Sequence, residues 1–267
     1  MSADIKKLRT RIKSVSSTMQ LTKAMGLVAS SKIRRALDSM NKAKQYYSAL
    51  GNAVSDLTLS SECKNSPYME KREAGNTLIC VIAGDRGLAG GYNANVFRLA
   101  KEYSDADFIT IGKRACERFE KETVLAEPVS FKDCKEMAVK ICDEFKNKKI
   151  DRFGIIMTRY ISMMSQEAQI KWVLPIAESE KNAESDVIFE PDELTVLDNI
   201  VPEFVAGAIY AAVKESFASE IAARRVAMDS AGKNAQQMID ELGLLYNRAR
   251  QGSITQEITE IVAGSDV

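Results

Sequence analysis

The chain has 267 residues, of which 45% are apolar, so it is long enough to bury a sizeable hydrophobic core. Its 37 basic and 37 acidic side chains cancel, and it contains no histidine. The lack of histidine excludes the Ser-His-Asp and Cys-His arrangements of nucleophilic catalysis and removes the commonest general base. The five cysteines show no CxxC spacing and have no histidine to complete a zinc site, so we expect reduced thiols and no metal or cofactor.

Charge is unevenly distributed along the chain. Residues 1–58 carry 11 basic against 3 acidic side chains, residues 59–202 carry 20 against 25, and residues 203–267 carry 6 against 9. A basic first segment can contact a nucleic acid, an anionic membrane surface or an acidic protein. Its basic residues are scattered and no aromatic residue precedes Tyr46, which favours a solvated helix surface. A nucleic-acid-binding coiled coil remains an alternative.

No apolar run approaches the length of about 18 residues that a membrane span needs. The N-terminus carries charge where a signal peptide has an apolar segment. We therefore expect the protein on the cytoplasmic side.

The first segment, residues 1–58, is predicted to be one long helix. All five prolines lie between positions 67 and 202, and the first 66 residues have none. Apolar or small residues recur there in alternating steps of three and four, a spacing typical of a coiled-coil helix, interrupted only by Thr22 and Gly26. The predicted seam consists of Ile5, Leu8, Ile12, Val15, Met19, Thr22, Gly26, Ala29, Ile33, Ala36, Met40, Ala43, Tyr47, Leu50, Val54 and Leu57.

The middle segment, residues 59–202, predicts a Rossmann-like, three-layer α/β domain with a parallel sheet, because short apolar runs alternate with helical patterns. Residues 166–176 are predicted to add a hairpin strand at the edge, and residues 60–76 and 178–195 to form loops. The predicted strands are 77–83, 107–111 and 151–158, and the predicted helices are 93–103, 113–121 and 132–148.

The last segment, residues 203–267, is predicted to be a second coiled-coil helix. Its seam is expected at Met228, Ala231, Ala235, Met238, Leu242, Leu245, Ala249 and Gly252. Both terminal helices leave the same middle domain, so if they pair they must run antiparallel. We expect residues 1 to about 57 to pair with residues from about 203 to 262.

A glycine-rich segment, Gly84-Asp-Arg-Gly-Leu-Ala-Gly-Gly91, follows the first predicted strand and opens a helix. Phosphate-binding loops occupy such a position, but this segment lacks the lysine of GxxxxGK[ST] and the order of GxGxxG. A tight strand-to-helix turn is therefore favoured, with Asp85 and Arg86 pairing or capping. A nucleotide-binding α/β enzyme remains the second alternative.

Three motifs in order resemble the gamma subunit of the F-type rotary ATP synthase, in its bacterial form. They are Ile12-Lys-Ser-Val15 through Lys32, Gly84 through Asn93, and Leu245 through Gln251 followed by Ile254 through Gly264. The resemblance covers nearly the whole chain. It implies a single, non-catalytic shaft that couples proton flow to ATP synthesis or hydrolysis.

The resemblance also implies partners and contact residues. The shaft would lie inside a ring of alpha and beta subunits and be joined to the epsilon subunit and to a membrane ring of c subunits. Its place would be the cytoplasmic face of the bacterial plasma membrane, as a peripheral protein. Met25, Arg250, Gln251 and Thr255 match family positions that face the alpha/beta ring.

Overall fold

The computed structural model describes residues 2–72, 75–178 and 189–265. Two long helices, α1 (Ser2–Leu57) and α5 (Glu193–Ser265), each contribute to two compact units. One unit contains residues 1–30 and 225–267, and the other contains residues 31–224. The predicted end of the first helix, at about residue 57, is confirmed.

In the first unit, the start of α1 and the end of α5 pair in antiparallel orientation. A Cβ atom added to Gly26 would lie 3.6 Å from the Met228 Cβ, and one added to Gly232 would lie 3.7 Å from the Thr22 Oγ1. The α1 seam is confirmed here, because each of its residues from Ile5 to Ala29 is buried or partly buried. Gly26, facing Met228, and Gly232, facing Thr22, leave room for the side chain of the opposite helix, so the two helices can lie close together.

The predicted seam of α5 is partly wrong. Met228, Ala235, Leu242 and Ala249 lie in it and Ala231 is partly buried beside it, but Met238, Leu245 and Gly252 are exposed. Burial instead follows Met228, Gly232, Ala235, Ile239, Leu242, Tyr246, Ala249 and Ser253. From Met228 onward, the predicted seam begins with a step of three residues, whereas the observed seam begins with a step of four. Both registers were possible because residues 238 and 239 are both apolar, as are residues 245 and 246.

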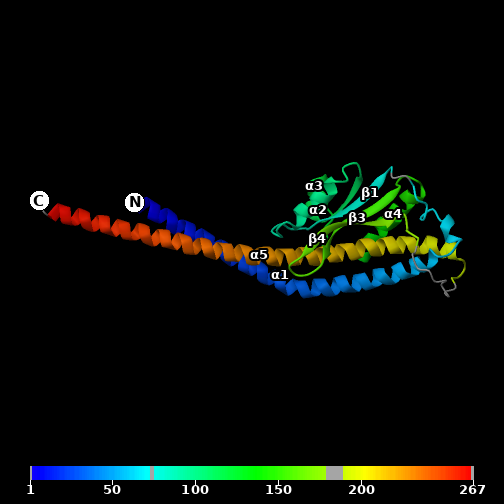
Figure 1. The fold of residues 1–267 in the computed structure, drawn as a ribbon, viewed down its shortest axis with the longest axis horizontal. Helices are drawn as coiled ribbons and strands as arrows, with labels where there is room; N and C mark the ends of the chain where they lie inside the picture. The colour runs from blue at the N-terminus through cyan, green and yellow to red at the C-terminus, as the bar shows by residue number, and fades with distance from the viewer. Residues whose placement is uncertain (1, 73–74, 179–188, 266–267) are drawn as a thin grey trace. The chain divides into compact units, whose positions relative to one another are not determined.

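Pairing also ends sooner than predicted. Residues 254–263 are exposed, and Figure 1 shows the end of α5 continuing past the start of α1. Since Thr22 lies opposite Gly232, the first residues of α1 lie opposite a position near residue 250. The α5 helix therefore extends beyond the start of α1, and the predicted pairing through residue 262 is wrong beyond residue 253.

In the second unit, four strands form one sheet in the order β2-β1-β3-β4. The central strand β1 (Thr77–Ile82) runs parallel to β2 (Asp107–Ile111) and to β3 (Arg152–Tyr160). The edge strand β4 (Gln166–Leu174) pairs antiparallel with β3, as the predicted hairpin requires.

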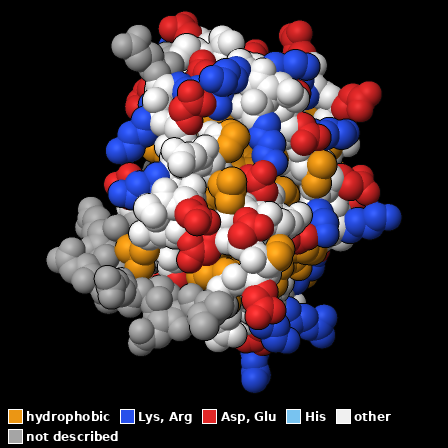
Figure 2. Space-filling view, turned by 90° about the vertical axis from the view of Figure 1, so that its right-hand side faces the viewer, with side chains coloured by type: hydrophobic (Ala, Val, Ile, Leu, Met, Phe, Trp, Pro, Cys, Tyr) orange, Lys and Arg blue, Asp and Glu red, His pale blue; other side chains and the backbone are white. Residues whose placement is uncertain are grey.

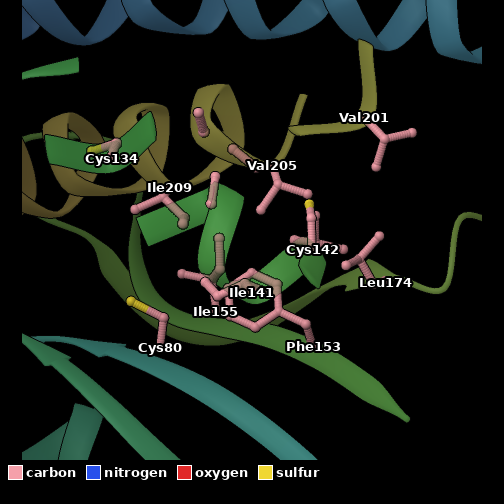
Figure 3. Packing of buried hydrophobic residues seen from close by; sticks show 14 of the residues in the cluster. Cys80, Cys134, Ile141, Cys142, Phe153, Ile155, Leu174, Val201, Val205 and Ile209 are labelled. Atoms are coloured by element: carbon pink, nitrogen blue, oxygen red, sulfur yellow. The ribbon is translucent and has the colours of Figure 1, made fainter. Parts of the chain in front are cut away.

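Helices cover both faces of this sheet. On one face α2 (Tyr92–Lys101) and α3 (Lys113–Phe119) pack on the alternate β1 residues Ile79 and Val81 and on Ala83, which follows the strand. On the other face α4 (Phe131–Lys146) and α5 pack on Leu78, Cys80 and Ile82. Figures 1 and 3 show this arrangement, with Cys80 facing the α4 and α5 side together with Cys134 and Ile209. The predicted α/β fold with three layers is confirmed.

The α5 helix begins ten residues before its predicted start, and Pro202 lies inside it. A proline inside a helix removes one backbone hydrogen bond and costs roughly 3 kcal/mol. Here Leu197, Val201 and Val205 are fully buried in the core, so their burial offsets that cost. The predicted loop 60–76 contains the short 3-10 helix Cys63–Asn65 and contributes Tyr68 to the core. Most of the predicted loop 178–195 falls outside the described residues.

One long helix of the described chain, spanning Glu193–Ala263, contains an 18-residue window of mean hydropathy 1.4. By length and composition alone this stretch could cross a membrane. It is not one continuous apolar run, and for that reason no such stretch is predicted from the sequence. However, 56% of the window is buried inside the structure, as expected of a core helix.

Candidate functional site

The C-terminal end of strand β3 is hydrogen-bonded to α5. The Thr158 N–H donates to Ser216 Oγ at 3.1 Å, and Ser219 Oγ donates to the Thr158 carbonyl at 3.0 Å. Ser216 and Ser219 are buried, and the Ser216 carbonyl also accepts a hydrogen bond from Tyr92 Oη at 3.0 Å. The sheet is therefore attached to α5 by directional polar contacts as well as by apolar packing.

Glu215 on α5 joins three elements. Its Oε1 accepts a hydrogen bond from the Tyr160 N–H at 3.0 Å. The same oxygen forms an ion pair with Lys44 Nζ on α1 at 2.6 Å. Lys171 on β4 lies nearby, with its Nζ 3.9 Å from the centre of the Tyr47 ring. Burial lowers the pKa of Lys171 below its ordinary value, and the charge of Glu215 opposes that change. Within this unit, α1, the sheet and α5 thus meet at one buried carboxylate.

The glycine-rich segment forms a turn that Asp85 holds in place. Asp85 Oδ1 accepts hydrogen bonds from the backbone N–H groups of Lys113 at 3.1 Å and Ala126 at 2.8 Å. Its Oδ2 accepts one from the N–H of Glu127 at 2.9 Å. Asp85 therefore caps the start of α3, as one of the two readings of this residue predicted, and ties the turn to the loop before α4.

Two residues of α5 hold the other side of the turn. Arg224 donates from Nε and Nη2 to the Gly87 carbonyl, at 3.3 and 3.2 Å, and its Nη2 also pairs with Glu220. Glu220 is 3% exposed, and a Cβ atom added to Gly84 would lie 2.8 Å from its Cδ. Burial raises the pKa of Glu220 above its ordinary value, while the Arg224 charge acts against the rise.

This geometry disfavours phosphate binding at the turn. The Gly84 N–H, which a phosphate would need, already donates to Asn93 Oδ1 at 2.9 Å. The carboxylates of Asp85 and Glu220 lie against the turn, and their charge would repel an anion. Among the described residues no group of histidine, cysteine, aspartate or glutamate side chains could hold a metal ion.

The four predicted contact residues all belong to the first unit, but they do not form one site. Arg250, Gln251 and Thr255 are exposed near the end of α5, where Thr255 Oγ1 donates to the Gln251 carbonyl at 3.0 Å. Met25 is partly buried on α1, one residue before Gly26, which faces Met228. With a rise of 1.5 Å per residue, the α5 positions opposite Met25 and at Arg250 lie about 30 Å apart.

The unpaired end of α5 also exposes apolar side chains that the sequence reading did not single out. They lie on one face, and their exposed fractions are 47% for Ile254, 56% for Ile258, 70% for Ile261 and 56% for Val262. The spacing of four and then three residues was visible in the sequence as a helix face. It was not recognised as exposed because the pairing of the two helices was expected to reach residue 262.

Figure 2 shows one face of the molecule with acidic and basic side chains interspersed and only small, separate apolar areas. A nucleic-acid-binding surface would instead gather basic groups of one sign. The face in view therefore gives no support to the nucleic-acid alternative.

The chain matches a family model described as ATP synthase over residues 4–266. A curated ATP synthase gamma chain from Ruminococcus albus is 41% identical over 281 residues, covering 98% of each chain. The sodium-ion-specific ATP synthase gamma chain of Acetobacterium woodii is 35% identical, covering 100% of this chain and 99% of that relative.

Solved structures show the same fold at lower identity. A chain of the Euglena gracilis mitochondrial ATP synthase, in the OSCP/F1/c-ring structure, aligns with a TM-score of 0.70 and 20% identity, covering 98% of this chain and 94% of that one. A chain of the rotor of the same enzyme aligns with a TM-score of 0.67 and 19% identity, covering 95% and 100%. Since the family model spans almost all residues and the curated relatives exceed 30% identity over their whole length, the chain belongs to the ATP synthase gamma-chain family.

Proposed function

We propose that the chain is the central rotor shaft of an ATP synthase, which couples proton flow through the membrane sector to conformational change at the nucleotide sites of its partners. The chain is a non-catalytic subunit. The observation that carries the proposal is the antiparallel pairing of α1 with α5, from which the end of α5 projects alone. A paired stalk with an exposed helical end can reach into a surrounding ring.

The proposed partners are the alpha and beta subunits around the shaft, the epsilon subunit, and the c-subunit ring, with one copy of this chain per complex. The exposed apolar face of Ile254, Ile258, Ile261 and Val262 supports a partner at the end of α5, because single helices rarely expose such a face to water. A chain with the same fold belongs to the Euglena gracilis structure that contains OSCP, F1 and the c-ring. We propose the cytoplasmic face of the bacterial plasma membrane as its place, in a peripheral position.

We further propose that Met25, Arg250, Gln251 and Thr255 contact the alpha/beta ring. Arg250 and Gln251 are exposed and polar, so they can form and break hydrogen bonds as the shaft turns. A shaft orientation that contacts one ring conformation better than another shifts the ring toward that conformation. Two levels of contact about 30 Å apart along the helix pair would act on different parts of the partners.

Copurification tests the proposal. The chain, carrying an affinity tag, is expressed from its own locus and the untagged proteins that remain bound are identified and counted. Proteins of the alpha and beta type at three copies each per tagged chain are the expected result. Recovery of the chain alone, or with nucleic acid, would refute it. Equilibrium dialysis of the isolated chain with ATP distinguishes the rotor shaft from the alternative of a nucleotide-binding enzyme. Saturable binding of ATP at micromolar concentration would support the enzyme and contradict the shaft.

A further inference from the structure

The glycine turn of residues 84–91 has no role in the function proposed above. We propose that Glu220 and Arg224 are positioning residues that lock this turn onto α5, so that the α/β layers and α5 rotate as one body. The inference rests on the proposed rotor function. It concerns residues 31–224 alone, where all the groups involved lie.

The first half of the lock is the guanidinium of Arg224. Two of its nitrogens reach the same carbonyl, that of Gly87, at 3.3 and 3.2 Å. The next residue, Leu88, has a φ of 62°, a left-handed conformation that is unfavourable for a bulky side chain. Its side chain is 62% exposed, so no packing around it explains this conformation. The bonds from Arg224 hold the carbonyl that precedes this strained residue.

The second half is the carboxylate of Glu220. It pairs with Arg224 and occupies the space beside Gly84 where any other residue would place its Cβ, so the helix and the turn are in direct contact. A buried ion pair contributes little net stability, because removing two charges from water costs about as much as their attraction returns. Such a pair is better suited to fixing one arrangement than to stabilising the fold.

The far side of the turn is fixed independently. Asp85 binds three backbone N–H groups of α3 and the loop before α4. The turn is therefore anchored to α5 by Arg224 and Glu220 and to the α/β layers by Asp85. Apolar packing is non-directional and resists sliding weakly, whereas a two-nitrogen contact to one carbonyl fixes both distance and angle. A twisting force on α5 would pass through this turn as well as through the hydrogen bonds that join Ser216 and Ser219 to Thr158.

The main test is Arg224→Lys in the assembled complex, with Arg98→Lys as the matched control. A lysine keeps the charge opposite Glu220 but cannot place two nitrogens on the Gly87 carbonyl. Arg98 is an exposed arginine of the same unit, and within the described part of the chain its side chain bonds only Asn95, on its own helix. In membrane vesicles we expect Arg224→Lys to lower the number of ions pumped per ATP hydrolysed by about twofold. The control should match the parent, and an unchanged ratio in Arg224→Lys would overturn the inference.

Hydrogen exchange on the isolated full chain separates this inference from the rotor function. We expect the amide of Gly84, which donates to Asn93 Oδ1, and that of Tyr92, which donates to the Ala89 carbonyl, to exchange about fivefold faster in Arg224→Lys than in the parent, the factor that corresponds to losing one net hydrogen bond. Equal exchange rates mean that Arg224 does not hold the turn, whatever the chain assembles with. Failure of the parental chain to join any ATP-hydrolysing complex would instead refute the rotor function.

A covalent replacement gives the rescue. Gly84→Cys with Glu220→Cys places two thiols where the carboxylate now touches the turn, and the five native thiols are buried. When reduced, this double variant lacks the pair and should pump fewer ions per ATP, like Arg224→Lys. When oxidised, it should recover the parental ratio, because a disulfide replaces the lock without restoring any charge. If the disulfide forms and the oxidised variant still pumps fewer ions per ATP than the parent, the result contradicts a mechanical role for this contact.

Discussion

Gly154 on β3 pairs with Trp172 on β4, and the indole ring covers the glycine. A Cβ atom added to Gly154 would lie 2.8 Å from Trp172 Cε3 and 3.3 Å from Ile170 Cδ1. Arg152 lies over the same ring, with its Cζ 3.6 Å from the ring centre. The indole therefore cannot withdraw without losing contacts on both sides.

We expect Gly154→Ala to lower the free energy of unfolding by about 1–3 kcal/mol, the usual cost of overpacking. Gly243→Ala is the matched control, because a Cβ at that position on α5 meets nothing within 4 Å. There alanine should raise stability by up to about 1 kcal/mol through its better helix propensity. Urea unfolding of the two variants and the parent measures both effects, and a stable Gly154→Ala variant would mean that the indole can move aside.

The corrected seam of α5 makes a paired prediction about two neighbouring residues. Ile239 is partly buried, whereas Met238 is 41% exposed. Ile239→Ala should therefore cost more stability than Met238→Ala, by roughly 1 kcal/mol or more. Thermal unfolding of both variants decides the register, and the reverse order would restore the seam that the sequence first indicated.

Ala235 offers a second test of the same seam. It is 6% exposed, and a larger side chain would push the paired helices apart. Ala235→Leu should cost about 1–3 kcal/mol. Gln236→Leu serves as the exposed control on the next position of the helix. An unchanged melting temperature for Ala235→Leu would place this residue outside the seam.

The sequence was most informative where its patterns were regular. The seam of α1 was predicted residue by residue, because sixteen positions in steps of three and four allow one register only. On α5 the adjacent apolar pair Met238 and Ile239 left two registers open. Pro202 was taken as a boundary, since the burial that offsets its cost depends on the whole core.

The polar lock was not foreseen, although its signal is present in the sequence. Glu220 and Arg224 stand four residues apart, the spacing of neighbours on one helix face, in a stretch that is otherwise mostly small or apolar. What the sequence does not give is the partner of that face. Only the fold brings Gly84 and Gly87 to it, from residues more than a hundred positions earlier.

Burial of the thiols predicts their reactivity and its pH dependence. Burial raises the pKa of Cys134 and Cys142 to about 12, from an ordinary value of 9.0. The native protein should therefore resist thiol reagents at pH 8, and all five cysteines should react once it is unfolded. Labelling of any thiol at a rate faster than unfolding would contradict this.

The same pKa shifts affect stability. A thiol whose pKa is raised by folding keeps its proton in the native state, while the unfolded state loses it from about pH 9 upward. These thiols therefore contribute stability that is fully present below pH 9 and decreases as the pH rises toward 12, by up to about 1.4 kcal/mol per pH unit for each group. The lowered pKa values of Lys171 and Lys214 act in the opposite direction at alkaline pH. Urea unfolding at pH 8, 9 and 10 should thus show a smaller loss of stability in Cys142→Ala than in the parent.

The last prediction concerns Arg250 and Gln251, whose contacts with the ring are proposed above. Both side chains are exposed, and among the described residues neither side chain takes part in an ion pair or a hydrogen bond, since the bond from Thr255 goes to the Gln251 backbone carbonyl. Truncating both to alanine should leave the melting temperature nearly unchanged, because exposed groups contribute little to stability and alanine favours the helix. In assembled complexes the double variant should slow ATP turnover or weaken its coupling to ion pumping, since the guanidinium can no longer hold a carboxylate at a defined shaft angle. ATP-driven pumping and ATP hydrolysis are measured together in membrane vesicles, with Arg118→Ala and Glu122→Ala as the exposed control pair on the α/β layers. If assembly, pumping and hydrolysis all match the parent, the force passes through other residues, and the exposed face of Ile254, Ile258 and Ile261 becomes the next surface to substitute.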